Sequence, residues 1–255
     1  MIGANREVES PMPYELYYWP GIPGRGEFVR LALEEVGAPY VDVAREHGEG
    51  RGVAAMTKIM RGKSGALAPF APPFLRDGDF IVSHVANILA YLGPKLGLAP
   101  RTEKLTFFAN GLQLTITDFV AEIHDTHHPI SGELYYEDQK KPAKARAAAF
   151  LDNRLPKFLG YFERVLEENP AGPAHSVGAW LTTVDLSLFQ LSEGLAYAFP
   201  RAMAKFSVKY PALAALREAV RERPAMANYL ASPRRLPFNE SGVFRHYPEL
   251  DQEAR

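Results

Sequence analysis

The 255-residue chain contains no cysteine. Disulfides, cysteine metal ligands and cysteine nucleophiles are therefore excluded, and we expect a reducing, cytoplasmic compartment. No apolar run approaches the ~18 residues that a membrane-spanning helix needs. The chain also has no excess of charge of one sign, because its 29 Lys and Arg residues nearly balance its 30 Asp and Glu residues. This balance gives no electrostatic basis for binding nucleic acid or an anionic membrane.

The amino-terminal segment lacks the apolar stretch of a signal peptide, so residues 1–13 are expected to form a flexible tail. Hydrophobic residues make up 47% of the chain, which is enough for a substantial core. The length fits one large domain or two smaller ones.

Residues 14–36, YELYYWPGIPGRGEFVRLALEEV, predict a strand, a turn and a helix. Aromatic residues dominate the strand, and proline and glycine then interrupt regular structure. The turn places the strand end beside the amino terminus of the helix, whose unpaired amides favour an anion. A phenol, from Tyr17 or Tyr18, and the guanidinium of Arg25 are expected at the same edge.

The next residues predict a second strand at residues 40–44, a hairpin and a further helix. Asp77-Gly78 between two short apolar runs is a strong hairpin signal. Ser83 is expected to cap the helix that follows. Together these elements form a predicted domain over residues 14–95.

Periodic apolar residues predict an all-helical domain over residues 96–231. Within it, residues 182–185 form a capping sequence before a helix that is apolar almost all round and hence buried. Pro211 and Pro224 each suit the first position of a helix. Residues 232–255 are not periodic but carry three aromatic residues, so we expect an extended arm that packs near the domain cleft.

These pieces, in this order, resemble the cytosolic glutathione S-transferase family over residues 14–231, and its tyrosine-type, bacterial-like members in particular. Tyr18-Trp19-Pro20 and Gly24-Arg25 look like the family's first strand and turn, and Pro73 looks like its cis-proline before the hairpin. The resemblance implies an α/β, thioredoxin-like amino-terminal domain, an all-α helical-bundle carboxy-terminal domain and a homodimer.

The resemblance also implies conjugation of glutathione to hydrophobic electrophiles, a detoxification chemistry. A free thiol has a pKa near ~8.5, so little thiolate exists at neutral pH. Lowering that pKa by about two units needs about 2.7 kcal/mol, and one hydrogen bond to a charged group contributes roughly 1.5–3 kcal/mol. Tyr18 is the candidate donor to the glutathione sulfur. Tyr17 is the alternative, because successive strand residues face opposite sides of the sheet.

Further glutathione contacts follow from the resemblance. Arg25 is expected to meet a carboxylate, and Asp118, on the long helix that lines the family's dimer cleft, to meet the amine. Glutathione normally pairs with the backbone beside the cis-proline, but Pro72 at that position has no amide to donate. His84 and Val85 occupy the positions where Gln or Glu and then Ser or Thr usually hold the γ-glutamyl carboxylate.

Valine has no hydroxyl, so we expect weakened glutathione binding or a substitute contact from His84. A gapped alignment would use Ser83 and His84 instead. Pro72 and Val85 favour an alternative function, a protein on this fold that binds apolar ligands without turnover. A glutathione-dependent isomerase or lyase, using the same thiolate, is a third possibility.

Three histidines, His124, His127 and His128, have spacings that place them on one helix face, and three histidines can ligate zinc. No carboxylate is evident to support such a site beyond Asp125. Glutathione, as co-substrate, is therefore the expected small-molecule partner, and no metal is expected.

Overall fold

The computed structural model describes residues 12–62 and 67–252 of the chain. The expected tail falls largely on residues 1–11, and the end of the expected arm on 253–255; both lie outside the described residues. The amino-terminal elements are β1 (Tyr14–Tyr17), α1 (Gly26–Glu35), β2 (Tyr40–Asp42), a 3-10 turn (Val43–Arg45), α2 (Gly52–Met60), β3 (Phe74–Asp77), β4 (Phe80–Ser83) and α3 (Val85–Lys95).

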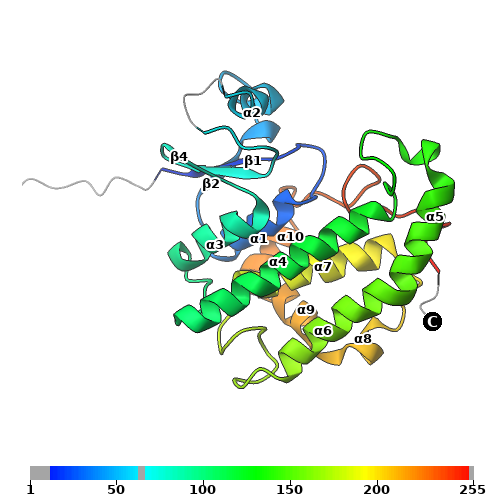
Figure 1. The fold of residues 1–255 in the computed structure, drawn as a ribbon. Coiled ribbons are helices and arrows are strands. Elements are labelled where there is room, and N and C mark those ends of the chain that lie inside the picture. The colour runs from blue at the N-terminus through cyan, green and yellow to red at the C-terminus, as the bar shows by residue number, and fades with distance from the viewer. Residues whose placement is uncertain (1–11, 63–66, 253–255) are drawn as a thin grey trace, which may run out of the picture.

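The four strands form one mixed sheet in the order β2-β1-β3-β4. β1 pairs with β2 in parallel, while β1–β3 and β3–β4 are antiparallel. Helices α1 and α3 cover one face and α2 the other (Figure 1). Leu16 packs toward α1 and α3, whereas Tyr17 packs toward α2 and stacks on Phe74 with ring centroids 4.6 Å apart. The side chains of successive residues of β1 thus point to opposite faces of the sheet.

The expected hairpin at Asp77-Gly78 is present, and Gly78 adopts the left-handed conformation (φ 62°) that the turn requires. The expected cap at Ser83 is wrong, because Ser83 is the last residue of β4. His84 instead stands at the N-cap of α3 and makes no side-chain capping bond. Its amide donates to the carbonyl of Pro73 at 3.2 Å, which ties the start of α3 to the beginning of β3.

The remaining described elements are helical: α4 (Glu103–Asp125), a 3-10 turn (Tyr136–Asp138), α5 (Lys140–Ala149), a π-helical turn (Phe150–Arg154), α6 (Leu155–Glu167), α7 (Thr183–Ala198), α8 (Phe206–Lys209), α9 (Pro211–Arg221) and α10 (Pro224–Leu230). The fold is thus a thioredoxin-like sheet domain joined to a helical bundle. Within the described residues, no helix combines the length and apolarity that crossing a bilayer would need.

Helix α7 is the buried centre of the bundle, as the sequence predicts. Its capping residue Asp185 accepts hydrogen bonds from the amides of Thr182 and Ser176, each at 2.7 Å. Pro211 and Pro224 begin α9 and α10, which confirms their predicted positions. Proline has no N–H, but an N–H in the first turn of a helix has no partner within the helix, so proline loses no hydrogen bond there.

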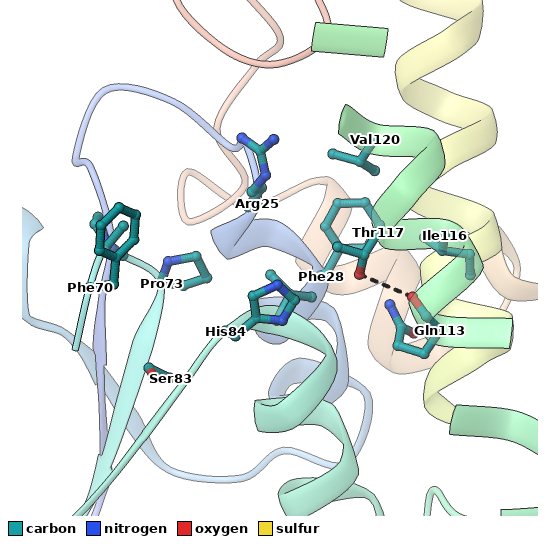
Figure 2. Close-up of a pocket in the computed structure, with 13 residues that line it drawn as sticks. Arg25, Phe28, Phe70, Pro73, Ser83, His84, Gln113, Ile116, Thr117 and Val120 are labelled. Carbon is teal, nitrogen blue, oxygen red and sulfur yellow. Dashed lines mark hydrogen bonds between the residues drawn. The ribbon is translucent and has the colours of Figure 1, made fainter. Parts of the chain in front are cut away.

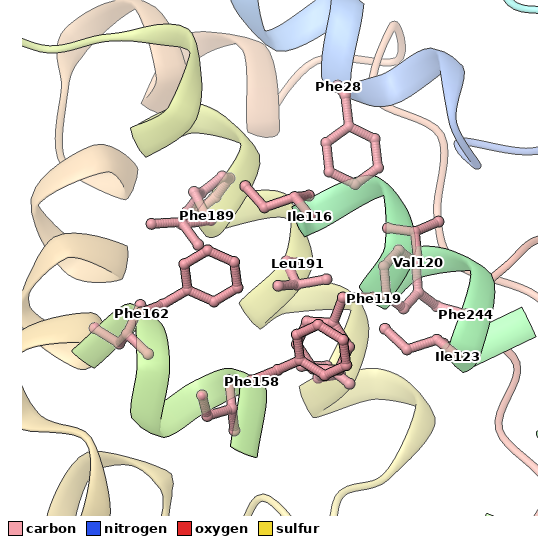
Figure 3. Close-up of a cluster of buried hydrophobic side chains, with 14 of the residues drawn as sticks. Phe28, Ile116, Phe119, Val120, Ile123, Phe158, Phe162, Phe189, Leu191 and Phe244 are labelled. Carbon is pink, nitrogen blue, oxygen red and sulfur yellow. The ribbon is translucent and has the colours of Figure 1, made fainter. Parts of the chain in front are cut away.

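One continuous apolar cluster joins the two parts of the molecule (Figure 3). Phe119 of α4 stacks on Phe158 of α6 with ring centroids 4.2 Å apart. Phe28 of α1 reaches into the same cluster from the sheet domain and is almost fully buried. The sheet domain and the bundle therefore share a packed interface, and any cavity along it has rigid walls on both sides.

The described part of the carboxy-terminal arm, residues 232–252, packs against the bundle. Phe244 lies on Gly194 of α7 so closely that a Cβ atom at that position would be 2.4 Å from the ring. Tyr247 stacks on Tyr136 with ring centroids 3.8 Å apart. Asp251 accepts hydrogen bonds from the amides of Arg201 and Ala202.

Candidate active site

A cavity of about 260 Å³ lies between the sheet domain and α4 (Figure 2). One wall comes from the start of α1, the segment before β3 and the β4–α3 junction; the other comes from α4. Five of the seven residues expected from the sequence line it, and they are Arg25, Pro72, Pro73, His84 and Val85.

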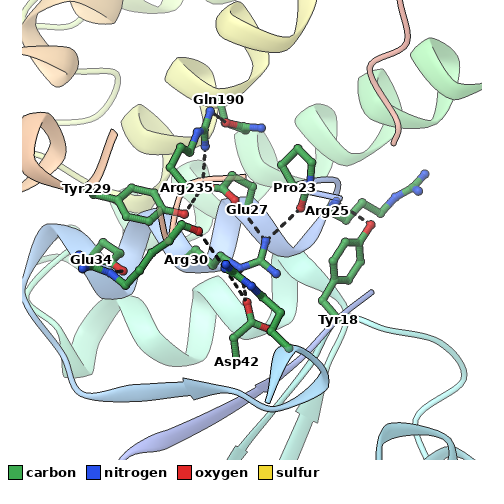
Figure 4. A network of polar contacts seen from close by, with 12 residues as sticks. Tyr18, Pro23, Arg25, Glu27, Arg30, Glu34, Asp42, Gln190, Tyr229 and Arg235 are labelled. Carbon is green, nitrogen blue, oxygen red and sulfur yellow. Dashed lines mark hydrogen bonds and ion pairs between the residues drawn. The ribbon is translucent and has the colours of Figure 1, made fainter. Parts of the chain in front are cut away.

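The two candidate phenols occupy different environments. Tyr17 donates its hydroxyl hydrogen to Glu15 Oε2 at 2.9 Å on the α2 side of the sheet. The Tyr18 hydroxyl accepts a hydrogen bond from the backbone amide of Arg25 at 2.9 Å (Figure 4). Among the described residues no acceptor takes the Tyr18 hydroxyl proton. Tyr18 is almost fully buried and is not among the residues that line the cavity; its hydroxyl lies next to the cavity residue Arg25, whose amide donates to it.

Burial raises the pKa of Tyr18 above its ordinary value, although the Arg25 amide and the charges of Arg25 and Arg30 act in the opposite direction. The phenol is consequently protonated at neutral pH and can donate a hydrogen bond. Close packing holds it in place, since a Cβ atom on Gly24 would be 2.3 Å from its hydroxyl oxygen and one on Gly26 would meet its ring.

Arg25 supplies the cavity with a positive charge. Arg25 lines the cavity from the turn before α1 (Figure 2). Within the described part of the chain no carboxylate pairs with it. A guanidinium without an internal partner at the wall of a cavity suits a ligand carboxylate.

The segment before β3 carries the expected cis peptide bond, between Pro72 and Pro73. Both prolines line the cavity, and neither has an amide hydrogen. The Pro73 carbonyl already accepts from His84. The carbonyl oxygens of this segment can accept hydrogen bonds from an extended ligand, but Pro72 has no amide hydrogen to donate to it.

The β4–α3 junction forms the third part of the wall. His84 has φ 72°, and it is the one non-glycine residue with positive φ among those described. Such a conformation costs energy for a residue with a Cβ atom and is found most often at ligand-binding positions. Val85 then begins α3, where its amide has no partner within the helix. Ser83, which the gapped alignment would use, lines the cavity together with His84 and Val85, so the ungapped alignment stays a prediction.

Asp118 does not line the cavity. It is exposed on the outer face of α4, which it shares with Phe107 and Leu114 at helical spacing. Its expected contact with a glutathione amine therefore requires a second copy of the chain.

The α4 wall was missed by reasoning from sequence. It presents Ile116 and Val120 as apolar groups, and Gln113 and Thr117 as polar groups, to the cavity. Gln113 is buried; its side-chain oxygen accepts from Ser187 at 2.8 Å, while its Nε2 has no partner among the described residues. In the sequence, the polar residues Gln113 and Thr117 beside an otherwise apolar stripe indicate that this side of α4 faces a cavity.

A buried charge network supports the site from behind (Figure 4). Arg30 of α1 donates to Asp42 at 2.7 Å and to Glu27 at 3.1 Å. Glu27 also accepts from Tyr229 at 2.6 Å and from Arg235 of the arm at 2.5 Å. Arg30 further donates to the carbonyl of Pro23, so the network holds the turn that carries Arg25.

Comparisons with known proteins agree with this geometry. A family model described as "Glutathione S-transferase, C-terminal domain" matches residues 124–233. A glutathione S-transferase of Plasmodium falciparum is 26% identical over 222 residues, which are 85% of this chain and 94% of that protein. Glutathione S-transferase P of Bos taurus is 26% identical over 234 residues, 90% of this chain and 98% of that protein. Along most of its length the chain is similar to cytosolic glutathione S-transferases.

Solved structures share the transferase fold along nearly the whole chain. A Pi-class glutathione S-transferase of Onchocerca volvulus superposes with a TM-score of 0.67 at 21% identity, covering 91% of this chain and 99% of that one. Prostaglandin synthase D of Nilaparvata lugens also gives a TM-score of 0.67, at 20% identity, covering 88% of this chain and all of that one. The cavity thus lies between the sheet domain and the helical bundle of this shared fold.

Proposed function

We propose that the protein conjugates the thiolate of glutathione to small hydrophobic electrophiles. The observation that carries this proposal is the Tyr18 hydroxyl, whose oxygen accepts from the amide of Arg25, a residue of the cavity wall, while no described residue accepts its proton. A hydrogen bond from this phenol to the glutathione sulfur would favour the thiolate by roughly 1.5–3 kcal/mol. That is enough to make a substantial fraction of the bound thiol reactive at neutral pH.

The other walls have matching roles in this proposal. Arg25 binds one glutathione carboxylate, and the free amides at the start of α3 bind the γ-glutamyl carboxylate. Phe28, Ile116 and Val120 form an apolar surface for the electrophile. Gln113 adds one amide group that can orient a polar atom of that substrate.

Pro72 and Val85 favour a second candidate, a protein that binds apolar ligands on this fold without turnover. Each removes one hydrogen bond that glutathione would otherwise receive. Chromatography on immobilised glutathione, followed by conjugation of an aryl halide, separates the two. Retention with turnover supports the transferase; binding of an apolar fluorescent probe, without retention or turnover, supports the binding protein.

Exchange of Val85 for threonine is expected to tighten glutathione binding about three- to thirtyfold. Threonine has nearly the shape of valine and adds a hydroxyl donor for the γ-glutamyl carboxylate, worth roughly 1.5–3 kcal/mol before the cost of ordering it. Calorimetric titration of both proteins measures the effect. Unchanged affinity in Val85→Thr, together with a large loss in Ser83→Ala, would show that the gapped alignment is right.

We further propose that the protein is a homodimer built on the exposed face of α4. Phe107 is 69% and Leu114 47% exposed there, and Asp118 lies on the same face. A dimer would cover the apolar side chains and bring Asp118 toward the partner's cavity. Phe107→Glu should weaken association at least about tenfold by placing a charge in an apolar contact. Sedimentation velocity measures this, with Val208→Glu, on an exposed apolar residue of α8, as the control.

A further inference from the structure

Three imidazoles gather where α4 ends. The ring centroids of His124, His127 and His128 form a nearly equilateral triangle with sides of 4.7, 4.9 and 5.0 Å. One nitrogen of each ring lies within 4.8 Å of a nitrogen of each other ring. His124 belongs to α4, and His127 and His128 follow its end, where both of their amides donate to the His124 carbonyl and keep the three rings together. Three ring nitrogens converging on one point form a set of donors that a metal ion can use.

The hydrogen bonds of His127 define which nitrogen is available. Its Nε2 lies 2.9 Å from the carbonyl oxygen of Val243. Because a carbonyl only accepts, Nε2 carries the proton and Nδ1 of the neutral ring holds a lone pair. That Nδ1 lies 2.5 Å from Nδ1 of His128. Because Nδ1 of His127 carries no proton, Nδ1 of His128 is the donor in this contact.

We propose that His124, His127 and His128 bind a divalent transition-metal ion, with zinc and cobalt as the best-matched ions. Bonds of about 2.05 Å in a tetrahedral site place ligand nitrogens about 3.3 Å apart. To reach that spacing, the His127–His128 pair, now 2.5 Å apart, would open by under about 1 Å, and His124 would close by up to about 1.5 Å from the 4.8 Å limit. A solvent molecule or an anionic ligand takes the fourth position.

The support that a histidine ligand needs is present. Ligating imidazoles usually donate their second N–H to a carboxylate or a backbone carbonyl, which fixes the tautomer. The Val243 carbonyl does this for His127. From sequence no metal was expected, because no carboxylate was evident for that role. The supporting group is instead a backbone atom of the arm, 116 positions away.

The local electrostatics are mixed. The carboxyl end of α4 favours a cation. Arg245 acts in the opposite direction, since it lies close enough to disfavour a positive charge on all three histidines. Its guanidinium donates to the carbonyls of Gly242 and Ser241. This charge lowers the affinity for metal without blocking the ring nitrogens.

Cobalt titration of the full-length, chelator-treated protein tests the site. The protein must carry no polyhistidine tag, and the buffer must contain no glutathione, because both bind metal. We expect saturation at one ion per chain, with the intense visible absorption of four-coordinate cobalt, and displacement of cobalt by zinc. His124→Gln and His128→Gln should each weaken cobalt binding at least about tenfold. His47→Gln, on an exposed histidine of the sheet domain, should bind as the unmodified protein does.

Absence of saturable binding, or equal binding by the unmodified protein and both ligand variants, would overturn the proposal. Circular dichroism checks that the variants are folded. If a variant is not folded, X-ray absorption of the zinc complex of the unmodified protein decides: three histidine nitrogens support the site, and oxygen-dominated scattering overturns it.

The metal-site proposal does not rest on glutathione conjugation. A protein that binds cobalt but fails the conjugation assay would refute the proposed function alone.

Discussion

Replacement of Tyr18 by phenylalanine is expected to lower the turnover number for conjugation about ten- to a thousandfold, the range for loss of one hydrogen bond to a charged atom. The phenol is buried and protonated, its oxygen is held by the Arg25 amide, and its proton is free of any described acceptor. Phenylalanine keeps the ring that packs against Gly24 and Gly26, so folding should change little. The loss should therefore appear in catalysis.

The pH dependence distinguishes a lost donor from general damage to the site. Without the Tyr18 hydroxyl, the pKa of the bound thiol should rise by about one to two units, toward that of free thiol. Stopped-flow absorbance of the thiolate against pH measures this in both proteins. Tyr17→Phe is the matched control, because the Tyr17 hydroxyl is bonded to Glu15 on the far side of the sheet. A loss in Tyr17→Phe, with unchanged turnover in Tyr18→Phe, would assign the donor to Tyr17.

Elements set by neighbouring residues could be predicted from the sequence. The Asp77-Gly78 hairpin, the cap at Asp185 and the helix starts at Pro211 and Pro224 each depend on backbone geometry within about four residues. The structure confirms all of them. The sequence favours Ser83 as the cap because serine is a good N-cap residue, but the His84 amide bonds to the Pro73 carbonyl and the cap lies one residue later, at His84.

The features that the sequence could not reveal depend on contacts between distant segments. No local pattern shows that Gln113 of α4 lines the same cavity as His84. The carbonyl that fixes the His127 tautomer and the arginine that pairs with Glu27 come from the arm, 116 and 208 positions away. Periodicity identifies which side of a helix is buried, but it does not identify the partner. For that reason the back of the site and its charge network emerged only from the structure.

The arm residue Arg235 is expected to contribute most to the stability of this network. Its side chain is 11% exposed and donates to Glu27, which is fully buried, and to Gln190 of α7. Arg235→Ala leaves the Glu27 charge with Arg30 and Tyr229 only. Breaking a buried ion pair in this way should lower the free energy of unfolding by about 3 kcal/mol. Chemical denaturation measures it, and limited proteolysis should show faster cleavage of the arm.

The preceding residue provides the control. Arg234 pairs with Glu34 but is 56% exposed, so Arg234→Ala should lower the free energy of unfolding by about 1 kcal/mol or less.

The dependence of stability on pH provides a second test. Burial alone would raise the pKa of Glu27, but Arg235 and Arg30 outweigh it and hold that pKa below its ordinary value. The contribution of Glu27 is therefore present above about pH 4.3 and is lost as the pH falls through its lowered pKa. Because Arg235→Ala has already lost much of that contribution, the difference in stability between the two proteins should shrink below pH ~4. A difference independent of pH would show that Arg235 stabilises the arm by packing and not through the Glu27 charge.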